Sequence, residues 1–154
     1  VALREETAID PDEDYGSLSA RLAAIGGRLL VEGLAAARRG EVTWQEQGEA
    51  GVTYAEKIGA EDRQIDPKQS ANQVHDLVRA LTPHIGAWLA LDDDRLGVKA
   101  TSVLESGPAA GEIGEEDGWP VLGCAEGAVR LERVQPPGKK PMDGDAWLRG
   151  HSRQ

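Results

Sequence analysis

The chain has 154 residues, of which 40% are hydrophobic and 29% are charged, the balance of an ordinary globular protein. Its apolar runs are far shorter than the roughly 20 residues that a membrane-spanning helix needs, so no such helix is expected. The single cysteine, Cys124, excludes an internal disulfide and a thiolate zinc cluster. We expect it to be a small buried hydrophobe in a protein of the reducing cytoplasm.

The net charge of −10 argues against nucleic-acid binding by the chain as a whole, because lysine and arginine drive contact with phosphates. The charge is unevenly distributed. Residues 1–118 hold 11 basic and 23 acidic side chains, whereas residues 119–154 hold 6 basic and 4 acidic ones. The basic residues of this second part are Arg130, Arg133, Lys139, Lys140, Arg149 and Arg153. Since binding depends on the field at one face, an acidic protein can still hold RNA through such a patch.

Residues 1–39 are predicted to form a short strand and a long helix. The strand ends at Ile9 and runs into an acidic turn. An apolar stripe of helical period follows, with Asp14 or Ser17 as the N-cap and Gly40 just past the helix end. One strand and one helix cannot bury such a stripe unaided, so we expect the chain to begin inside a longer protein. A helical arm on a self-contained protein is the alternative.

A second, shorter helix has the clearest local signals. Ser70 and Gln73 have the spacing of a capping box, in which each side chain satisfies a backbone N–H of the other residue. The apolar residues that follow at i, i+3, i+4 and i+7 are Val74, Leu77, Val78 and Leu81. Thr82-Pro83 ends the helix. His75, which lies outside this stripe, is expected at the surface.

The rest of the chain predicts short strands. Runs at 86–91 and 95–103 form one hairpin, and runs at 119–125 and 128–134 form another. In the last run, the side chains expected to face the core are those of Val129, Leu131 and Val134. The glycine-rich, acidic segment 105–118 is expected to be a loop. The pattern favours a mainly β fold with helices, an OB-like Greek-key barrel, although it does not distinguish this from another small barrel.

Residues 52–88 also carry a series of short motifs: Tyr-Ala-x-Lys-Ile, then Glu-Asp-x-x-Ile-Asp, then a helix that ends in Arg-Ala-x-x-Pro. The residues concerned are Tyr54, Ala55, Lys57, Ile58, Glu61, Asp62, Ile65, Asp66, Arg79, Ala80 and Pro83. In this order and spacing the stretch resembles the start of the C-terminal domain of the methionyl-tRNA formyltransferase family. The segment from Gly138 to Met142 is similar to the Gly-Lys-x-x-Met motif that ends the family's barrel. His84 departs from the family, many members of which have a Trp-Pro pair in this turn.

The resemblance implies a domain organisation. Residues 1–39 would be the last strand and helix of a truncated N-terminal formyltransferase domain of the α/β, Rossmann-like class. Residues 40–52 would be a linker, and residues 53–154 a C-terminal OB-like tRNA-binding domain.

The resemblance also implies a function in translation initiation. The family transfers a formyl group from 10-formyltetrahydrofolate to the amino group of initiator methionyl-tRNA. Its catalytic Asn, His and Asp lie in the missing N-terminal half, and no residue here matches them, so this chain alone is expected to be inactive. The expected partners are initiator tRNA and the missing catalytic domain. We expect a cytoplasmic monomer that binds no metal, no cofactor and no membrane.

Residues for tRNA binding are inferred from the same resemblance and from the basic C-terminal part, residues 119–154. Lys57, Lys139 and Lys140 are the first candidates for cations that contact phosphates, with Arg79, Arg130 and Arg149 behind them. Ordinary solvated surface charge is the alternative for each. Two other functions stay open at this point: a free-standing OB-type module that binds RNA or protein, and part of an amino-sugar formyltransferase.

Overall fold

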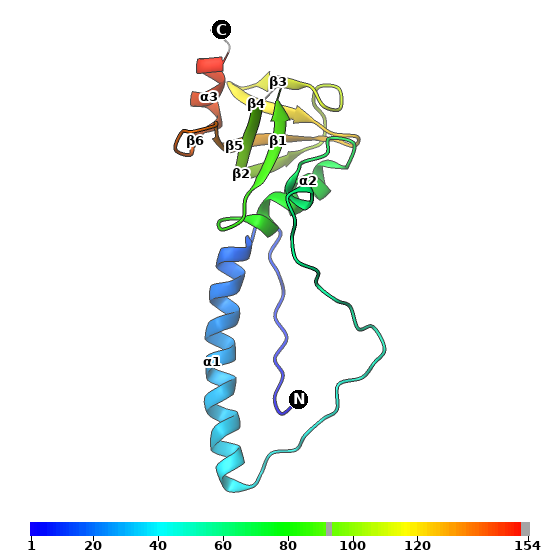
Figure 1. Ribbon diagram of the computed structural model, residues 1–154, viewed down its shortest axis with the longest axis vertical. Coiled ribbons are helices and arrows are strands. Elements are labelled where there is room, and N and C mark those ends of the chain that lie inside the picture. The colour runs from blue at the N-terminus through cyan, green and yellow to red at the C-terminus, as the bar shows by residue number, and fades with distance from the viewer. Residues whose placement is uncertain (92–93, 152–154) are drawn as a thin grey trace. The chain divides into compact units, whose positions relative to one another are not determined.

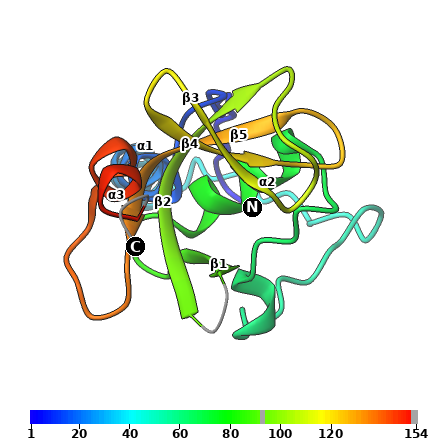
Figure 2. The same cartoon turned by 90° about the horizontal axis from the view of Figure 1, so that it is seen from above.

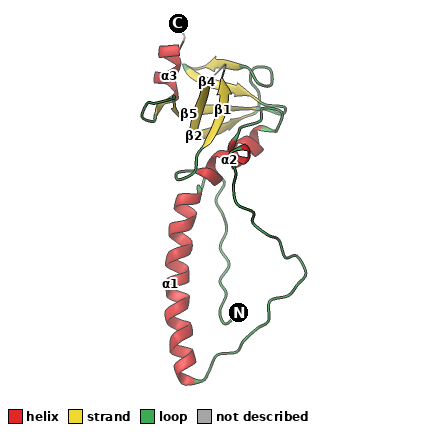
Figure 3. Ribbon diagram, in the orientation of Figure 1, coloured by secondary structure: helices red, strands yellow, loops and turns green. Residues whose placement is uncertain are grey.

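The computed structural model describes residues 1–91 and 94–151. The chain divides into two compact units, Val1–Lys57 and Ile58–Gln154, and each is described by itself. Helices and strands are shown along the chain in Figure 1 and by type in Figure 3. Within the described residues, no helix combines the length and the apolar character that crossing a membrane requires.

The first unit contains one long helix, α1 (Tyr15–Arg39), as the apolar stripe predicted. Asp14 is the N-cap, because its Oδ1 accepts a hydrogen bond of 2.8 Å from the Ser17 amide. Gly40 ends the helix in the left-handed region, with φ of 71°, a conformation that costs glycine little. Both helix signals in the sequence are therefore confirmed.

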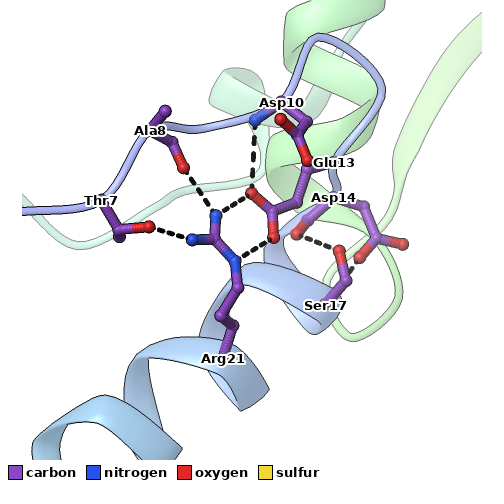
Figure 4. Close-up of polar contacts among 7 residues, drawn as sticks. All are labelled: Thr7, Ala8, Asp10, Glu13, Asp14, Ser17 and Arg21. Atoms are coloured by element: carbon purple, nitrogen blue, oxygen red, sulfur yellow. Dashed lines mark hydrogen bonds and ion pairs between the residues drawn. The ribbon is translucent and has the colours of Figure 1, made fainter.

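The strand predicted to end at Ile9 is wrong: residues 1–9 form no strand. A strand is held by hydrogen bonds to a neighbouring strand, and this unit has none to offer among the described residues. Instead, two arginines of the helix, Arg21 and Arg28, hold the segment through side-chain contacts. Figure 4 shows the Arg21 guanidinium among Thr7 Oγ1, the Ala8 carbonyl oxygen and the Glu13 carboxylate.

The ion pair between Arg21 and Glu13 joins Nη2 and Oε2 over 2.5 Å. The hydrogen bond from Arg21 is the main reason that the pKa of Glu13 is lowered from its ordinary value. A lowered pKa in the folded state means that the pair stabilises this unit at neutral pH. That contribution is lost as the pH falls through the pKa of the folded state.

Replacing Arg21 should therefore raise the pKa of Glu13. In Arg21→Gln, NMR titration of the Glu13 side-chain carbonyl should give a pKa closer to the ordinary value of a glutamate. Arg28→Gln is the matched control, because Arg28 lies on the same helix but pairs with Glu5 and Glu32. An unchanged Glu13 pKa in Arg21→Gln would contradict the contact.

The second unit begins with a short 3-10 turn, η1 (Glu61–Arg63), and then the helix α2 (Ala71–Leu81). The capping box is confirmed: the Gln73 amide donates to Ser70 Oγ over 3.3 Å, and the Ser70 amide donates to Gln73 Oε1 over 3.0 Å. The buried residues of α2 are Ala71, Val74, Val78 and Leu81. Leu77 is only half-buried.

The predicted surface position of His75 is wrong. Its ring is half-buried, and Nδ1 lies 3.0 Å from the hydroxyl of Thr101, which is buried in strand β2 (Asp94–Leu104). The apolar stripe could not reveal this contact, because the Thr101 hydroxyl comes from a strand 26 residues away along the chain. The pair adds a polar link between α2 and the sheet.

Six strands form one antiparallel sheet. They are β1 (Ala87–Leu91), β2 (Asp94–Leu104), β3 (Ile113–Glu116), β4 (Trp119–Gly123), β5 (Ala128–Gln135) and β6 (Met142–Asp143). Their order is β1-β2-β5-β4-β3, and β6 also pairs with β5. Strands β3, β4 and β5 follow one another as hairpins while β2 lies beside β5, which is a Greek key. The predicted fold class, mainly β with helices, is confirmed.

Two sequence predictions within this sheet have opposite outcomes. Both expected hairpins form, although the Asp92–Asp93 turn of the first lies outside the described residues. The segment 105–118, expected to be a loop, contains strand β3, whose register runs from Ile113 opposite Leu122 to Glu116 opposite Trp119. An Ile-Gly-Glu-Glu strand has no apolar alternation, so only its pairing with β4 identifies it.

The core lies between the sheet and the helices. Val129, Leu131 and Val134 of β5 are fully buried, as predicted, and Cys124 is also buried. The helix α3 (Gly144–His151) adds Trp147, which is 8% exposed. Figure 2 shows α3 from above, and its contacts are with β4, β5 and β6.

Close approach of α3 to the sheet depends on Gly144. A Cβ at this position would lie only 1.8 Å from the carbonyl oxygen of Leu131, a backbone atom that cannot move aside cheaply. Gly150, one residue before the end of the same helix, has no atom within 4 Å of its Cβ position. Only the first of these glycines is required for packing.

Gly144→Ala should therefore lower the free energy of unfolding by about 2 kcal/mol or more, since it forces α3 away from β5. Gly150→Ala should leave this free energy unchanged or raise it by up to about 1 kcal/mol through helix propensity. Urea denaturation followed by tryptophan fluorescence measures both values. Equal effects of the two substitutions would contradict the packing described.

Candidate nucleic-acid interface

The turn between β5 and β6 presents the two adjacent candidate lysines. The Lys139 amide donates to the Pro136 carbonyl over 3.1 Å, and Gln135 Nε2 donates to the Lys139 carbonyl over 3.1 Å. Gly138 takes a φ of 68° within this turn. Lys139 and Lys140 are both exposed. The backbone of the turn is thus tied to the sheet while both ammonium groups face solvent.

A cleft beside α3 joins Lys139 to an aromatic pair. Its apolar lining includes Pro136, Met142 and the ring of Trp147, and Asp94 adds a carboxylate to the lining. The His151 ring stacks on Trp147 with 4.9 Å between ring centroids and 18° between their planes. The apolar walls and the aromatic face have the chemistry that suits a nucleobase, whereas the charge of Lys139 is opposed by that of Asp94.

Arg149 lies on α3 but already has a carboxylate partner. Its Nη1 donates to Asp145 Oδ2 over 2.8 Å, one helical turn back. This bond is the main reason that the pKa of Asp145 is lowered, and the Ala146 amide lowers it further. Arg149 is exposed, so it can still contact a phosphate, but part of its field is cancelled by Asp145.

Arg79 and Arg130 are half-buried on other elements. Arg79, on α2, donates from Nε to Asp76 over 2.8 Å. Arg130, on β5, lies opposite Val121 of β4 and Ser102 of β2. Its Nε is buried and has no hydrogen-bond partner within the described ranges 1–91 and 94–151.

The structure brings only some of the candidate residues together. Lys139, Lys140 and α3 with Arg149 share one region of the second unit, since Lys139 and α3 line the same cleft. Arg79 and Arg130 lie on α2 and β5, away from that turn. Lys57 is the last residue of the first unit and is exposed, so it is described apart from the others.

Three cations of the second unit were missed in the sequence: Arg63, Arg95 and Lys99. The guanidinium carbon of Arg95 lies 4.3 Å from the centroid of the Trp88 ring, on the neighbouring strand. A signal was available in the sequence, because residues 95, 97 and 99 alternate with the apolar Leu96 and Val98. Strand alternation therefore puts Arg95 and Lys99 on the outward face.

No side chain in the described part of the chain forms a recognisable catalytic or metal site. Across these residues, no three His, Cys, Asp or Glu side chains group closely enough to hold a metal ion. Burial raises the pKa of the Cys124 thiol, which keeps it protonated and poorly nucleophilic at neutral pH.

Comparison with known proteins gives a consistent picture. Residues 57–152 match the family described as the formyl transferase C-terminal domain. A methionyl-tRNA formyltransferase of Dinoroseobacter shibae is 41% identical over 97% of this chain and 48% of its own length. One of Brucella ovis is 37% identical over 97% of this chain and 50% of its own length. The chain thus spans about half the length of these relatives.

Solved structures of HypX from Aquifex aeolicus share the fold. One variant superposes with a TM-score of 0.68 at 17% identity, over 92% of this chain and 27% of HypX. Another gives a TM-score of 0.62 at 19% identity, over 80% of this chain and 23% of HypX. At 17–19% sequence identity, this similarity shows a shared fold only.

Removing the charge of Arg149 should raise the pKa of Asp145. In Arg149→Gln, NMR titration should show a rise towards the ordinary aspartate value, but not all the way, because the Ala146 amide still donates to Asp145. The control is Arg133→Gln, since Arg133 pairs with Asp143 instead. A pKa of Asp145 that shifts equally in both variants would count against the assigned pair.

Proposed function

Because this chain belongs to the formyl transferase C-terminal domain family, we propose that it is the tRNA-binding, C-terminal part of a methionyl-tRNA formyltransferase. The observation that carries this proposal is the similarity to enzymes of that name, at 37–41% identity over 97% of the chain. The whole enzyme would transfer a formyl group from 10-formyltetrahydrofolate to the amino group of initiator methionyl-tRNA, in translation initiation in the cytoplasm.

The proposed domain organisation assigns residues 1–39 to the end of the catalytic domain, 40–52 to a linker and 53–154 to the tRNA-binding domain. The state of α1 supports the first assignment. None of its residues is buried, and its apolar side chains are 48% to 68% exposed at Leu22, Leu30, Val31 and Leu34. A helix with such an apolar stripe is stable in water when another layer covers it.

We place the formyl-transfer chemistry and the binding of 10-formyltetrahydrofolate outside this chain. The side chains of its described part offer neither an activated nucleophile nor a general base next to one. The role of this chain would be to hold the tRNA while its aminoacyl end reaches the catalytic domain. Correct placement of the two reactants is itself a large share of catalysis in such a transfer.

Lys57, Lys139 and Lys140 are the proposed first contacts with tRNA phosphates, and Arg79, Arg130 and Arg149 the second. Exposure of all three lysines supports this ranking. Arg79 and Arg149, in contrast, already donate to carboxylates within their own helices. Contacts of this kind position the RNA without reading its sequence. The part of the chain from residue 119 onward, at net +2, supports the same location.

A filter-binding assay tests the binding role. It measures how much of an initiator tRNA transcript the protein retains on nitrocellulose as the salt concentration rises. We expect the chain to bind at low salt and Lys139→Ala/Lys140→Ala to bind more weakly. The slope of log affinity against log salt should fall by roughly 0.7–0.9 for each phosphate that the variant no longer neutralises. Lys68→Ala is the control, because Lys68 is exposed but lies outside the proposed interface.

Two results would overturn this role: no retention at low salt, or binding that salt does not weaken. The enzymatic part of the proposal has a separate test. The genomic sequence upstream of the codon for Val1 should continue in frame and encode the catalytic Asn, His and Asp. The whole protein should then formylate methionyl-tRNA, and its failure to do so would refute the assignment even if the chain binds tRNA.

A further inference from the structure

The outward face of the β1–β2 hairpin carries a cation layered on an aromatic ring. Leu89 and Leu96 lie opposite each other and are buried, so strand alternation turns Trp88 and Arg95 to the other face. The Arg95 guanidinium carbon lies 4.3 Å from the centroid of the Trp88 ring. Arg95 is exposed and Trp88 half-buried, so the arginine lies on the solvent side of the ring.

Two further cations meet at Gly86, immediately before β1. Arg63 Nε donates to the Gly86 carbonyl oxygen over 3.1 Å. The ammonium of Lys99 lies 2.7 Å from the position that a Cβ on Gly86 would occupy, so the glycine leaves room for it. Both cationic side chains are half-buried. A bridge between Gln64 and Trp88 holds the Arg63 segment beside β1, which links this pair to the layered arginine.

These three cations have no ion-pair partner within residues 1–91 and 94–151, although the chain carries a net charge of −10. Like charges that gather at a half-buried position repel one another and lose hydration, which costs free energy without a counter-charge. Asp94, the neighbour of Arg95, points to the opposite face and lines the cleft beside α3. The arrangement therefore has the electrostatics of an anion site.

Carboxylates also lie near this face. Glu61 and Asp66 lie beside β1 near Ala90, on the side where Gln64 forms a bridge to Trp88. At the Gly86 end of the hairpin, the charged side chains are those of Arg63 and Lys99. An anionic ligand would thus approach from the Gly86 end and extend over the Arg95 layer.

We infer that Arg63, Lys99, Arg95 and Trp88, here called the hairpin face, form a subsite for an unpaired RNA nucleotide. Arg63 and Lys99 take the phosphate. The base of the adjoining nucleotide stacks on the Arg95 guanidinium, on the side away from the Trp88 ring. A peptide carboxylate would satisfy the two cations but would leave the stacking surface unused. The inference rests on the tRNA binding proposed above and adds four residues that the sequence did not single out.

Substitutions at the hairpin face separate charge from stacking. Arg63→Gln and Lys99→Gln should each lower the salt slope of tRNA binding by roughly 0.7–0.9. Arg95→Lys keeps the charge but removes the planar stacking surface, so affinity should fall at least about fivefold while the salt slope stays unchanged. Arg4→Gln, an exposed arginine of the first unit, is the control for the removal of one positive charge.

A direct readout comes from the indole N–H signal of Trp88 in an NMR titration. A short single-stranded RNA should shift this signal in the wild-type chain and shift it less in Arg95→Lys. Thermal melting of each variant confirms folding; if Arg63→Gln unfolds, Lys99→Gln alone decides the phosphate contact.

The outcomes distinguish the two proposals. If the wild-type chain does not retain tRNA, the binding role itself fails. If the chain retains tRNA and depends on Lys139 and Lys140, but the hairpin-face variants bind as the wild type does, the role stands and the subsite is overturned. A Trp88 signal that RNA leaves unshifted overturns it as well.

Discussion

Hydrogen bonding along both edges of strand β5 holds the second unit together. β2 pairs along one edge, and β4 and then β6 pair along the other, while Val129, Leu131 and Val134 fill the core. The lysine turn starts where this strand ends, and α3 packs against the carbonyl of Leu131 with only a glycine between them. The positions of the lysine turn and of α3 thus depend on one central strand.

Some cations of this unit are neutralised by a carboxylate on the same helix, and others are available to bind an anion. Arg79 and Arg149 each donate to an aspartate on the same helix, so a phosphate must compete with a carboxylate for them. Lys139 and Lys140 extend from a turn, and Arg63 and Lys99 converge on Gly86. An acidic chain can therefore present local positive fields, because short-range pairing cancels charge in some places and leaves it in others.

Local sequence patterns predicted most of the secondary structure and part of the site. The caps at Asp14 and Ser70 act within three residues, and the β4–β5 hairpin needs only alternation and a turn, so no distant contact was required. Lys139 and Lys140 were inferred as candidates from the family resemblance and from the basic end of the chain, and the structure shows both exposed. Prediction was wrong where a strand depends on a distant pairing partner. Residues 1–9 form no strand because no second strand pairs with them, and β3 is a strand because β4 hydrogen-bonds to it.

The sequence by itself determined the two longer helices, the two hairpins, the buried face of β5 and the family resemblance, since each rests on residues close together in the chain. Only the tertiary structure decided which cations share a surface. Arg63 and Lys99 are 36 positions apart, and the carbonyl and the missing side chain of Gly86 bring them together. Sequence spacing carries no information about such a meeting, because pairing between strands, rather than chain distance, sets it.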